Sequence, residues 1–144
     1  MQNCIFCEIL AGRLAASIVQ QDEQCTAFMD IRPVNPGHLL VIPNQHAASL
    51  AELEPDCAAQ LFKTGQQLAA ALRQSGLRCE GINLFLADGQ VAGQEVFHTH
   101  LHVLPRFAGD GFGFRFPAGY PAIQERNTLD QQARMIRAKL NQPL

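Results

Sequence analysis

The sequence has no strong excess of charge of either sign. Its net charge is -2 with histidine counted as neutral, and its pI is near 6.2. Its cations are scattered, apart from Arg134, Arg137 and Lys139 near the C-terminus, which we interpret as the solvated end of a helix. Proteins that bind a nucleic acid backbone have a basic patch or a high pI. We therefore expect no nucleic acid partner.

Long apolar runs, repeats and low-complexity linkers are also missing. No stretch approaches the roughly 20 apolar residues of a transmembrane helix, so we expect no membrane span. The first residues, Met1 to Phe6, contain no basic segment followed by an apolar run, which argues against a secretory signal. With 144 residues, 47% of them hydrophobic, the chain is expected to form a single domain over residues 1–144.

The number of cysteines is odd, so they cannot all pair within one chain. The sequence has five, at Cys4, Cys7, Cys25, Cys57 and Cys79. Disulfides are rare in the reducing cytoplasm. We therefore expect a cytoplasmic protein with reduced thiols.

Hydrophobic periodicity predicts short strands around one long helix. That helix begins near Pro55 and ends near Gly76. Shorter helices are expected over residues 7–11 and after Thr128, which starts a capping-box pattern. Strands are predicted over residues 24–29, 38–43, 81–87 and 98–105. Strands and helices do not alternate strictly, which indicates an α+β fold: an antiparallel sheet with one long helix packed on it.

Three of the five histidines, His98, His100 and His102, stand at alternate positions of one predicted strand. Alternate side chains of a strand share a face, so the three imidazoles would lie together, with Thr99, Leu101 and Val103 on the other, core-like face.

Three interpretations of this arrangement are open. The histidines are a chance feature of a wet face, or they bind one metal ion, or the middle imidazole is a nucleophile whose neighbours manage charge and protons. A flat strand separates the first and last Cα atoms by roughly 13 Å, which makes a shared ion difficult, although two neighbours could manage it. Upstream, Gly93 allows the backbone to approach a ligand and to present N–H groups to an anion; taken alone, the segment is an ordinary hairpin loop.

The run from Phe97 to Leu104 resembles the signature of the histidine triad (HIT) family of nucleotide hydrolases and nucleotidyl transferases. Further segments are similar to the family in order and spacing, and the likeness extends from Cys4 to about Phe114. These segments are residues 4–9 (CIFCEI), 27–31 (AFMDI), 36–43 (PGHLLVIP), and Asp88-Gly89 followed by 92–94 (AGQ).

The resemblance implies a five-stranded antiparallel sheet with a long helix and a C-terminal helix, a homodimer, and a purine nucleotide as ligand. It implies that His100 attacks the α-phosphorus and carries the nucleotidyl group until water releases it. His102 would contact the phosphate or the leaving group, and His38 and His98 would belong to the same network. The residues expected at the substrate are Phe28 and Ile31 beside the base, Asp30 on the ribose, and Asp88, Gly93, Gln94 and Val96 around the phosphate.

Two positions depart from the family pattern. Ala87 stands where many relatives have Asn, which removes one polar contact to the ribose or phosphate. Glu95 stands where some relatives have Ser or Thr near the leaving group. A carboxylate there would disfavour an anionic leaving group and would suit a cationic amine.

The Cys4-x-x-Cys7 pair indicates half of a zinc site or a redox pair, although its surroundings do not resemble a thioredoxin-like unit. Similar bacterial members of the family bind zinc through such a pair, a histidine at the place of His46 and the first triad histidine. The resemblance therefore implies a structural zinc site of Cys4, Cys7, His46 and His98. The alternative is that both cysteines are idle thiols. No cofactor is expected for catalysis itself.

Three functions follow from these patterns. The first is a hydrolase of phosphoramidates or related nucleotide conjugates, which the intact triad favours. The second is a nucleotide-binding regulatory module with little turnover, for which Ala87 leaves room. The third is a metalloenzyme that uses the triad as ligands.

Overall fold

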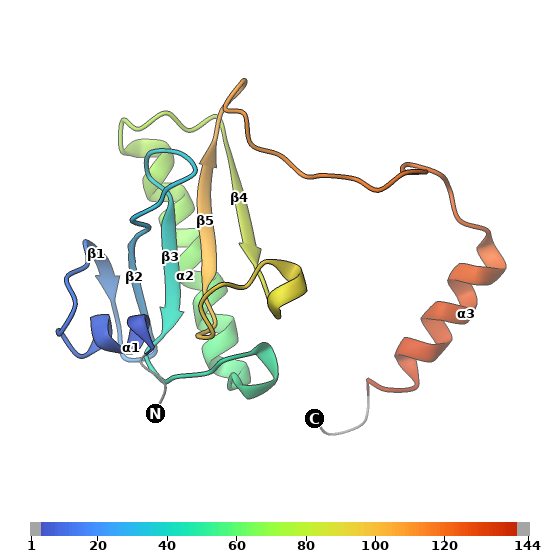
Figure 1. Cartoon of the computed structure of the whole chain (residues 1–144), viewed down its shortest axis with the longest axis horizontal. Helices are drawn as coiled ribbons and strands as arrows, with labels where there is room; N and C mark the ends of the chain where they lie inside the picture. The colour runs from blue at the N-terminus through green and yellow to red at the C-terminus, as the bar shows by residue number, and fades with distance from the viewer. Residues whose placement is uncertain (1–3, 141–144) are drawn as a thin grey trace. The chain divides into compact units, whose positions relative to one another are not determined.

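The computed structural model describes residues 4–140, in two compact units that meet in sequence between Phe112 and Gly113 (Figure 1). The first unit holds a five-stranded sheet and the long helix. Its elements are α1 (Ile5–Leu10), β1 (Ile18–Gln21), β2 (Cys25–Met29), β3 (Leu39–Pro43), the 3-10 turn η1 (Leu50–Glu52), α2 (Pro55–Gln74), β4 (Gly81–Leu86), the 3-10 turn η2 (Gln90–Ala92) and β5 (Leu101–Arg106). The second unit holds α3 (Arg126–Arg137). A single domain over residues 1–144 stays a prediction.

All neighbouring strands of the sheet are antiparallel, in the order β1-β2-β3-β5-β4. The predicted α+β class, the five strands and the packed long helix are therefore confirmed. β3 and β5 are neighbours although 57 residues separate Pro43 from Leu101. This pairing brings the predicted histidine strand beside the strand that follows His38.

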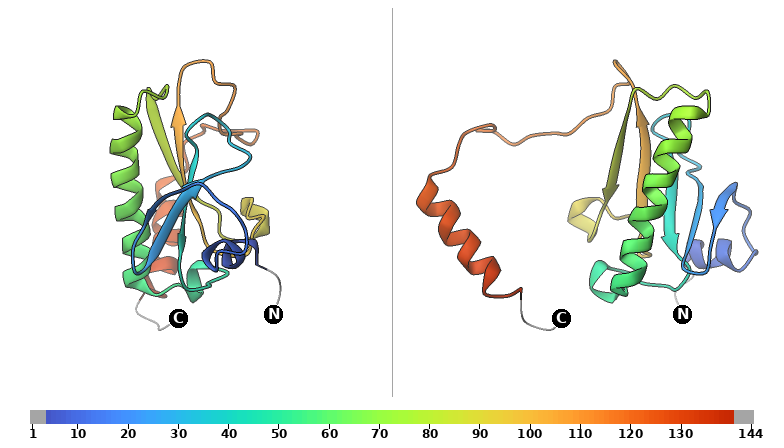
Figure 2. Two further views of the ribbon diagram at one scale, coloured as in Figure 1. Left: turned by 90° about the vertical axis from the view of Figure 1, so that its left-hand side faces the viewer. Right: turned by 180° about the vertical axis from the view of Figure 1, so that it is seen from behind.

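The two faces of β3 are covered by different helices. Leu39 and Val41 belong to the apolar core shared with α2, whereas Leu40 and Ile42 pack with Phe6 of α1. Figure 2 shows α1 and α2 on opposite sides of the sheet. Since both faces of the central strand are buried, its sequence is apolar throughout, as a strand between two layers requires.

The predicted long helix and three strands agree with the structure to within one or two residues at each end. α2 begins at Pro55 and its C-cap is Ser75, followed by Gly76 at a φ of +85°. Strand β1 was not predicted, because it is an edge strand whose Ile18 and Val19 are half exposed and give no buried apolar alternation.

The predicted histidine strand over residues 98–105 is wrong at its N-terminal end. β5 begins at Leu101, so His98, Thr99 and His100 precede it. Pairing with both neighbouring strands ends at Leu101. On the side toward His98, Leu101 makes the last pair with β3, at Val41, and the last pair with β4, at Leu86. Beyond that point Thr99 donates its N–H and its hydroxyl to the carbonyl of Ala47, at 2.7 and 2.9 Å, instead of joining a strand.

The predicted helix starts near both termini are also corrected. α1 runs from Ile5, not from Cys7, because the Sγ of Cys4 caps it by accepting the N–H of Cys7 at 3.5 Å. α3 starts at Arg126, so Thr128 lies inside the helix and does not cap it. The helical spacing of Leu129, Ala133, Ile136 and Leu140 predicts an apolar face, but α3 has no buried residue, and Ile136 and Leu140 are largely exposed.

Within residues 4–140, no helix has the length and apolar character needed to cross a bilayer.

Gly37, directly before His38, offers a test of how closely the segment before β3 packs against Leu72 and Leu77. Its φ is +95°, and a Cβ there would lie 3.0 Å from side-chain atoms of Leu72 and Leu77. Gly76 has a similar φ of +85° but open space around it. We expect Gly76→Ala to lower the free energy of unfolding by about 1 kcal/mol through backbone strain alone. Gly37→Ala should lower it by about 2–4 kcal/mol, because overpacking adds to the strain.

Urea denaturation of both variants measures the difference. Equal losses for Gly37→Ala and Gly76→Ala would contradict the close packing at Gly37.

Candidate functional site

A row of side chains crosses the sheet on the face that α1 covers. The register pairs Phe28 with Leu40, Leu40 with His102, and His102 with Phe85. The rings of Phe85 and His102 stack, with centroids 4.3 Å apart and planes at 11°. His102 is therefore held between neighbouring strands with its imidazole on this face.

The three triad histidines remain on this same side of the sheet, although only His102 belongs to β5. The ring of Phe6 contacts those of His98 and His100 edge-on, at centroid distances of 5.8 and 5.3 Å. His100 and His102 lie 4.9 Å apart by their centroids. The helix α1, through Phe6, thus packs directly on the catalytic candidates.

Hydrogen bonds fix the protonation of His38 and His102. The N–H of Val34 donates to Nδ1 of His38 at 3.2 Å, so neutral His38 carries its proton on Nε2. That Nε2 lies 2.9 Å from Nδ1 of His102 and donates to it. Neutral His102 therefore carries its own proton on Nε2 and can donate it to a ligand.

Burial keeps both imidazoles uncharged. It lowers the pKa of His38, against a smaller opposing effect of Asp30. It also lowers the pKa of His102 to about 4, with smaller contributions from His100 and His38. The Asp30 carboxylate, 3.8 Å from His38 Nε2, does not reverse either shift.

In His100 the two ring nitrogens have the opposite roles to those in His102: Nδ1 is the donor and Nε2 carries the lone pair. Its Nδ1 lies 2.8 Å from the carbonyl oxygen of His98, to which it donates a proton. The lone pair of neutral His100 is then on Nε2. The side chain lines a cavity of about 740 Å3. An imidazole held this way has the free nitrogen that nucleophilic attack requires.

The cavity is mostly apolar, with a few convergent polar groups, as in small-molecule binding sites. It is lined by Ile5, Phe6, Ile9, Leu14, Ala15, Ala16, Phe28, Met29, Asp30, Ile31, Arg32, Val34, His38, Leu40, Phe85, Ala87, Ala92, Gly93, Glu95, Val96, His100, His102 and Phe112. Five of the seven predicted substrate contacts are among them: Phe28, Asp30, Ile31, Gly93 and Val96.

The other two predicted contacts do not line the cavity. Gln94 is buried, and its amide donates to the carbonyls of Ala48 and Val96 while accepting the N–H of Gly89. The carboxylate of Asp88 accepts the N–H of Leu50 at 3.0 Å. Both side chains therefore hold the loops around the cavity instead of facing into it.

Sequence reasoning gave no role to several lining residues. Ile5, Phe6 and Ile9 belong to α1, and their spacing on a helix would have marked one apolar face. Arg32 and Phe112 lie outside the regular elements, and no sequence pattern marks them.

The two departures from the family pattern both lie at this cavity. Ala87 is buried and contributes a methyl group to the lining. Glu95 is not isolated, since its Oε2 lies 3.2 Å from Nη2 of Arg32.

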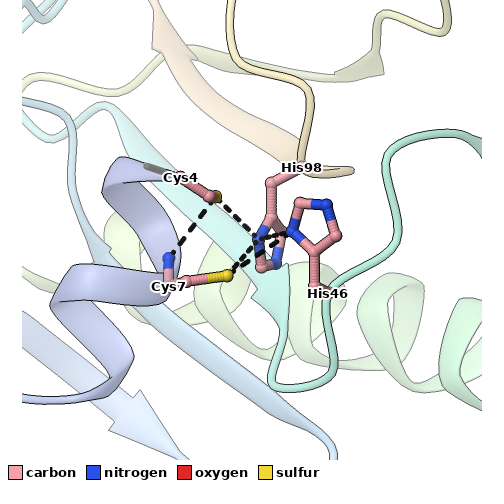
Figure 3. A group of neighbouring side chains, drawn as sticks. All are labelled: Cys4, Cys7, His46 and His98. Carbon is pink, nitrogen blue, oxygen red and sulfur yellow. Dashed lines mark hydrogen bonds between the residues drawn. The ribbon is translucent and has the colours of Figure 1, made fainter. Parts of the chain in front are cut away.

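A second group of side chains lies beside the cavity, where Cys4, Cys7, His46 and His98 point toward one another (Figure 3). The Nδ1 atoms of His46 and His98 are 3.3 Å apart, and three sulfur–nitrogen distances are 3.4, 3.4 and 3.6 Å. A tetrahedral zinc site with ordinary bond lengths has nitrogen–nitrogen edges of about 3.3 Å and sulfur–nitrogen edges of about 3.6 Å. The donor set and spacing fit a zinc ion.

His98 is oriented for this cluster. Its Nε2 lies 2.9 Å from the carbonyl of Pro43 and donates to it, so the lone pair of neutral His98 is on Nδ1, facing Cys4. The triad does not converge on one ion: among residues 4–140, a second possible metal group contains His102 with Asp30 and His38, and neither group contains two triad histidines.

Comparison with known proteins identifies the family. The model of the HIT domain matches residues 11–109. The chain belongs to the HIT family. A HIT-like protein of Borreliella burgdorferi is 43% identical over 116 residues, which cover 80% of this chain and 84% of that protein.

Solved HIT structures agree with the fold. A HIT family protein from Bacillus anthracis superposes with a TM-score of 0.87 at 35% identity, covering 97% of this chain and 99% of that one. A Zn-bound histidine triad family protein from Mycobacterium smegmatis gives 0.74 at 38% identity, with 96% of each chain covered.

Two further structures carry functional names. A histidine triad nucleotide-binding protein from Candida albicans gives a TM-score of 0.84 at 25% identity, covering 96% of this chain and 97% of that one. A HIT family hydrolase from Legionella pneumophila gives 0.62 at 35% identity, covering 81% and 100%.

The pKa of His102 predicts how the stability of this HIT protein depends on pH. The pKa is 6.5 for an ordinary histidine and about 4 for His102 in the fold. Between these values the unfolded chain binds the proton more tightly, so the folded state loses stability as the pH falls from 6.5 to 4. We expect His102→Asn to reduce this loss by about 1–2 kcal/mol.

Urea denaturation of both proteins at pH 7 and at pH 4.5 measures the effect. If the variant loses as much unfolding free energy as the wild type, His102 is not the group that resists protonation.

Proposed function

We propose that the protein is a nucleotide hydrolase and nucleotidyl transferase that cleaves the bond at the α-phosphorus of purine nucleoside phosphoramidates or related conjugates. The observation that carries the proposal is the orientation of His100. Its Nδ1 is held by the carbonyl of His98 at 2.8 Å, which leaves Nε2 free in a nucleotide-sized cavity. The hydrolase name of a HIT relative supports the same reaction class.

In the first step, the Nε2 lone pair of His100 attacks the α-phosphorus. A P–N bond forms, the bond to the leaving group breaks, and the leaving group departs with that electron pair and takes up a proton from water. The carbonyl of His98 stabilises the positive charge that develops on the His100 ring. The Nε2–H of His102 donates to a phosphoryl oxygen or to the leaving group, supported by His38 behind it.

In the second step, water attacks the phosphorus of the nucleotidyl-histidine. The P–N bond breaks, its electron pair returns to Nε2 of His100, the nucleoside monophosphate leaves and a proton passes to solvent. The pKa of His102 lies near 4, so its Nε2–H remains a neutral donor and adds no charge near pH 7.

The remaining lining residues suit a nucleotide. Asp30 accepts hydrogen bonds from ribose hydroxyls, Phe28 and Ile31 flank the base, and the backbone N–H of Val96 meets the phosphate. The N–H of Gly93 donates to the carbonyl of Gln90 at 3.0 Å, so Gly93 serves by letting the phosphate approach the backbone closely. Gln94 is assigned a supporting role, since its amide is engaged with main-chain groups.

A nucleotide-binding module with little turnover is the second candidate. It is favoured by the methyl group of Ala87 in the cavity lining, where a polar side chain would add a contact to the ribose or phosphate. The nucleotide-binding name of a HIT relative fits both candidates.

We also propose a structural zinc ion held by Cys4, Cys7, His46 and His98. The tetrahedral spacing of these donors and the Zn-bound relative support it. Bound zinc would fix α1 and the segment before β5 against each other, and no catalytic step needs it. We propose a homodimer in the cytoplasm. β4 is an edge strand of the sheet, and an edge strand can pair with a strand of a second copy.

The hydrolase proposal is tested with adenosine 5′-monophosphoramidate. The wild type should release AMP, and His100→Ala should lower kcat by about a thousandfold or more while AMP binding persists, because the nucleophile is lost and the cavity is kept. Asp30→Asn is the matched control for binding, and should weaken AMP affinity. Wild-type protein that binds AMP without turnover would favour the binding module.

The zinc proposal is tested by metal analysis. We expect one zinc per chain, lost in Cys7→Ser and in His46→Ala. Cys79→Ser, which alters a half-buried thiol outside the cluster, should retain it. At free zinc 100- to 1000-fold above its Kd, removal should lower the free energy of unfolding by about 3–4 kcal/mol. A second metal that disappears in His100→Ala would instead favour a metalloenzyme.

A further inference from the structure

The charged side chains that line the cavity are Asp30, Arg32 and Glu95. Arg32 follows β2, and Glu95 lies in the segment between η2 and β5. The two come from separate segments and form an ion pair, with Nη2 of Arg32 at 3.2 Å from Oε2 of Glu95. Within residues 4–140, Arg32 is the one Lys or Arg that lines the cavity.

Hydrogen bonds hold the backbone near each residue of this pair, whereas the two side chains are largely exposed. Oδ1 of Asp30 accepts the N–H of Arg32 at 2.8 Å, and the amide of Gln94 donates to the carbonyl of Val96 at 3.2 Å. The side chains of Arg32 and Glu95 are 80% and 77% exposed. Each can therefore turn away from the other while its Cα stays in place.

In the proposed binding mode, the nucleoside does not contact Arg32 or Glu95. Asp30, Phe28 and Ile31 serve the ribose and base in the proposed binding mode, and His102 serves the phosphate. In an in-line displacement the leaving group departs on the side of phosphorus opposite to the nucleophile. Arg32 and Glu95 are the charged lining residues left to meet it.

Resting on the proposed hydrolase function, we propose that Arg32 and Glu95 form a leaving-group subsite that accepts either sign of charge. Glu95 binds a cationic amine, and Arg32 binds an anionic group such as a carboxylate or a phosphate. The partner that is not used turns into solvent. A neutral leaving group leaves the pair closed.

With this subsite, Glu95 no longer disfavours an anionic leaving group. Alone, its carboxylate would repel an anionic leaving group. With the guanidinium of Arg32 at 3.2 Å, the two charges nearly cancel at a distance, and neither sign is excluded. An exposed ion pair contributes about 0.2–1 kcal/mol, so opening it costs little.

The experiment uses adenosine 5′-phosphoramidates of three amines of equal length, which end in a methyl, an ammonium or a carboxylate group. All three present the same P–N bond. For each protein, kcat/KM of each charged substrate is divided by that of the methyl substrate. These ratios cancel any general effect of a substitution on catalysis.

Reciprocal changes are expected in the two single variants. Glu95→Gln should lower the ammonium ratio and raise the carboxylate ratio, each by about two- to fivefold. Arg32→Gln should do the reverse, and the double variant should lower both ratios, because neither charged partner remains to bind the substrate. At 1 M salt, where screening acts within about 3 Å, the differences should shrink.

Arg78→Gln and Glu80→Gln are matched controls. This pair has a similar separation, 3.1 Å, and is also largely exposed, and neither residue lines the cavity. Both ratios should stay at the wild-type value in these controls.

Changes below twofold in both single variants, or changes in the same direction for both charges in either of them, would overturn the subsite. Absence of turnover of the methyl substrate by the wild type would instead overturn the hydrolase proposal, because that substrate makes no demand on the ion pair.

Discussion

The position of His98 is the constraint on which the site depends. Its Nε2–H is fixed on the carbonyl of Pro43, its Nδ1 faces Cys4, Cys7 and His46, and its own carbonyl accepts the proton of His100 Nδ1. One buried residue therefore joins the end of β3, the cysteine pair and the proposed nucleophile. Breaking any of these bonds leaves a buried polar group without its partner, which typically costs about 1–3 kcal/mol. The orientation of His100 is thereby protected by the stability of the fold.

Much of the fold could be predicted from the sequence, because it follows from local patterns. The apolar residues of 39–43 and the helical spacing in α2 each identify one element, and the resemblance to the HIT family supplied the number of strands and their antiparallel arrangement. The errors lie where local pattern and tertiary partners disagree. His98 and His100 have strand periodicity, but β3 and β4 both end their pairing at Leu101, so no ladder extends to them.

The residues of the candidate site were easier to predict from the sequence than the directions of their side chains. The triad and the Cys4–Cys7 pair are recognisable because rare residue types stand at fixed spacing, whereas Asp30 follows only from the family resemblance. Side-chain direction in the loops is not readable in this way. Gln94 turns toward main-chain groups and Glu95 toward Arg32, and both outcomes depend on neighbours far away in sequence, Ala48 and Arg32.

The helix α1 has a consequence for binding thermodynamics. It has six residues, far fewer than an isolated helix needs to be stable, so its position depends on what it contacts. Cys7 belongs to the cluster with Cys4, His46 and His98, while Ile5, Phe6 and Ile9 form part of the cavity wall. Ligands that both require the same ordered helix assist each other, and the assistance is reciprocal. A nucleotide in the cavity would strengthen metal binding at the cluster by the same free energy by which the metal strengthens nucleotide binding.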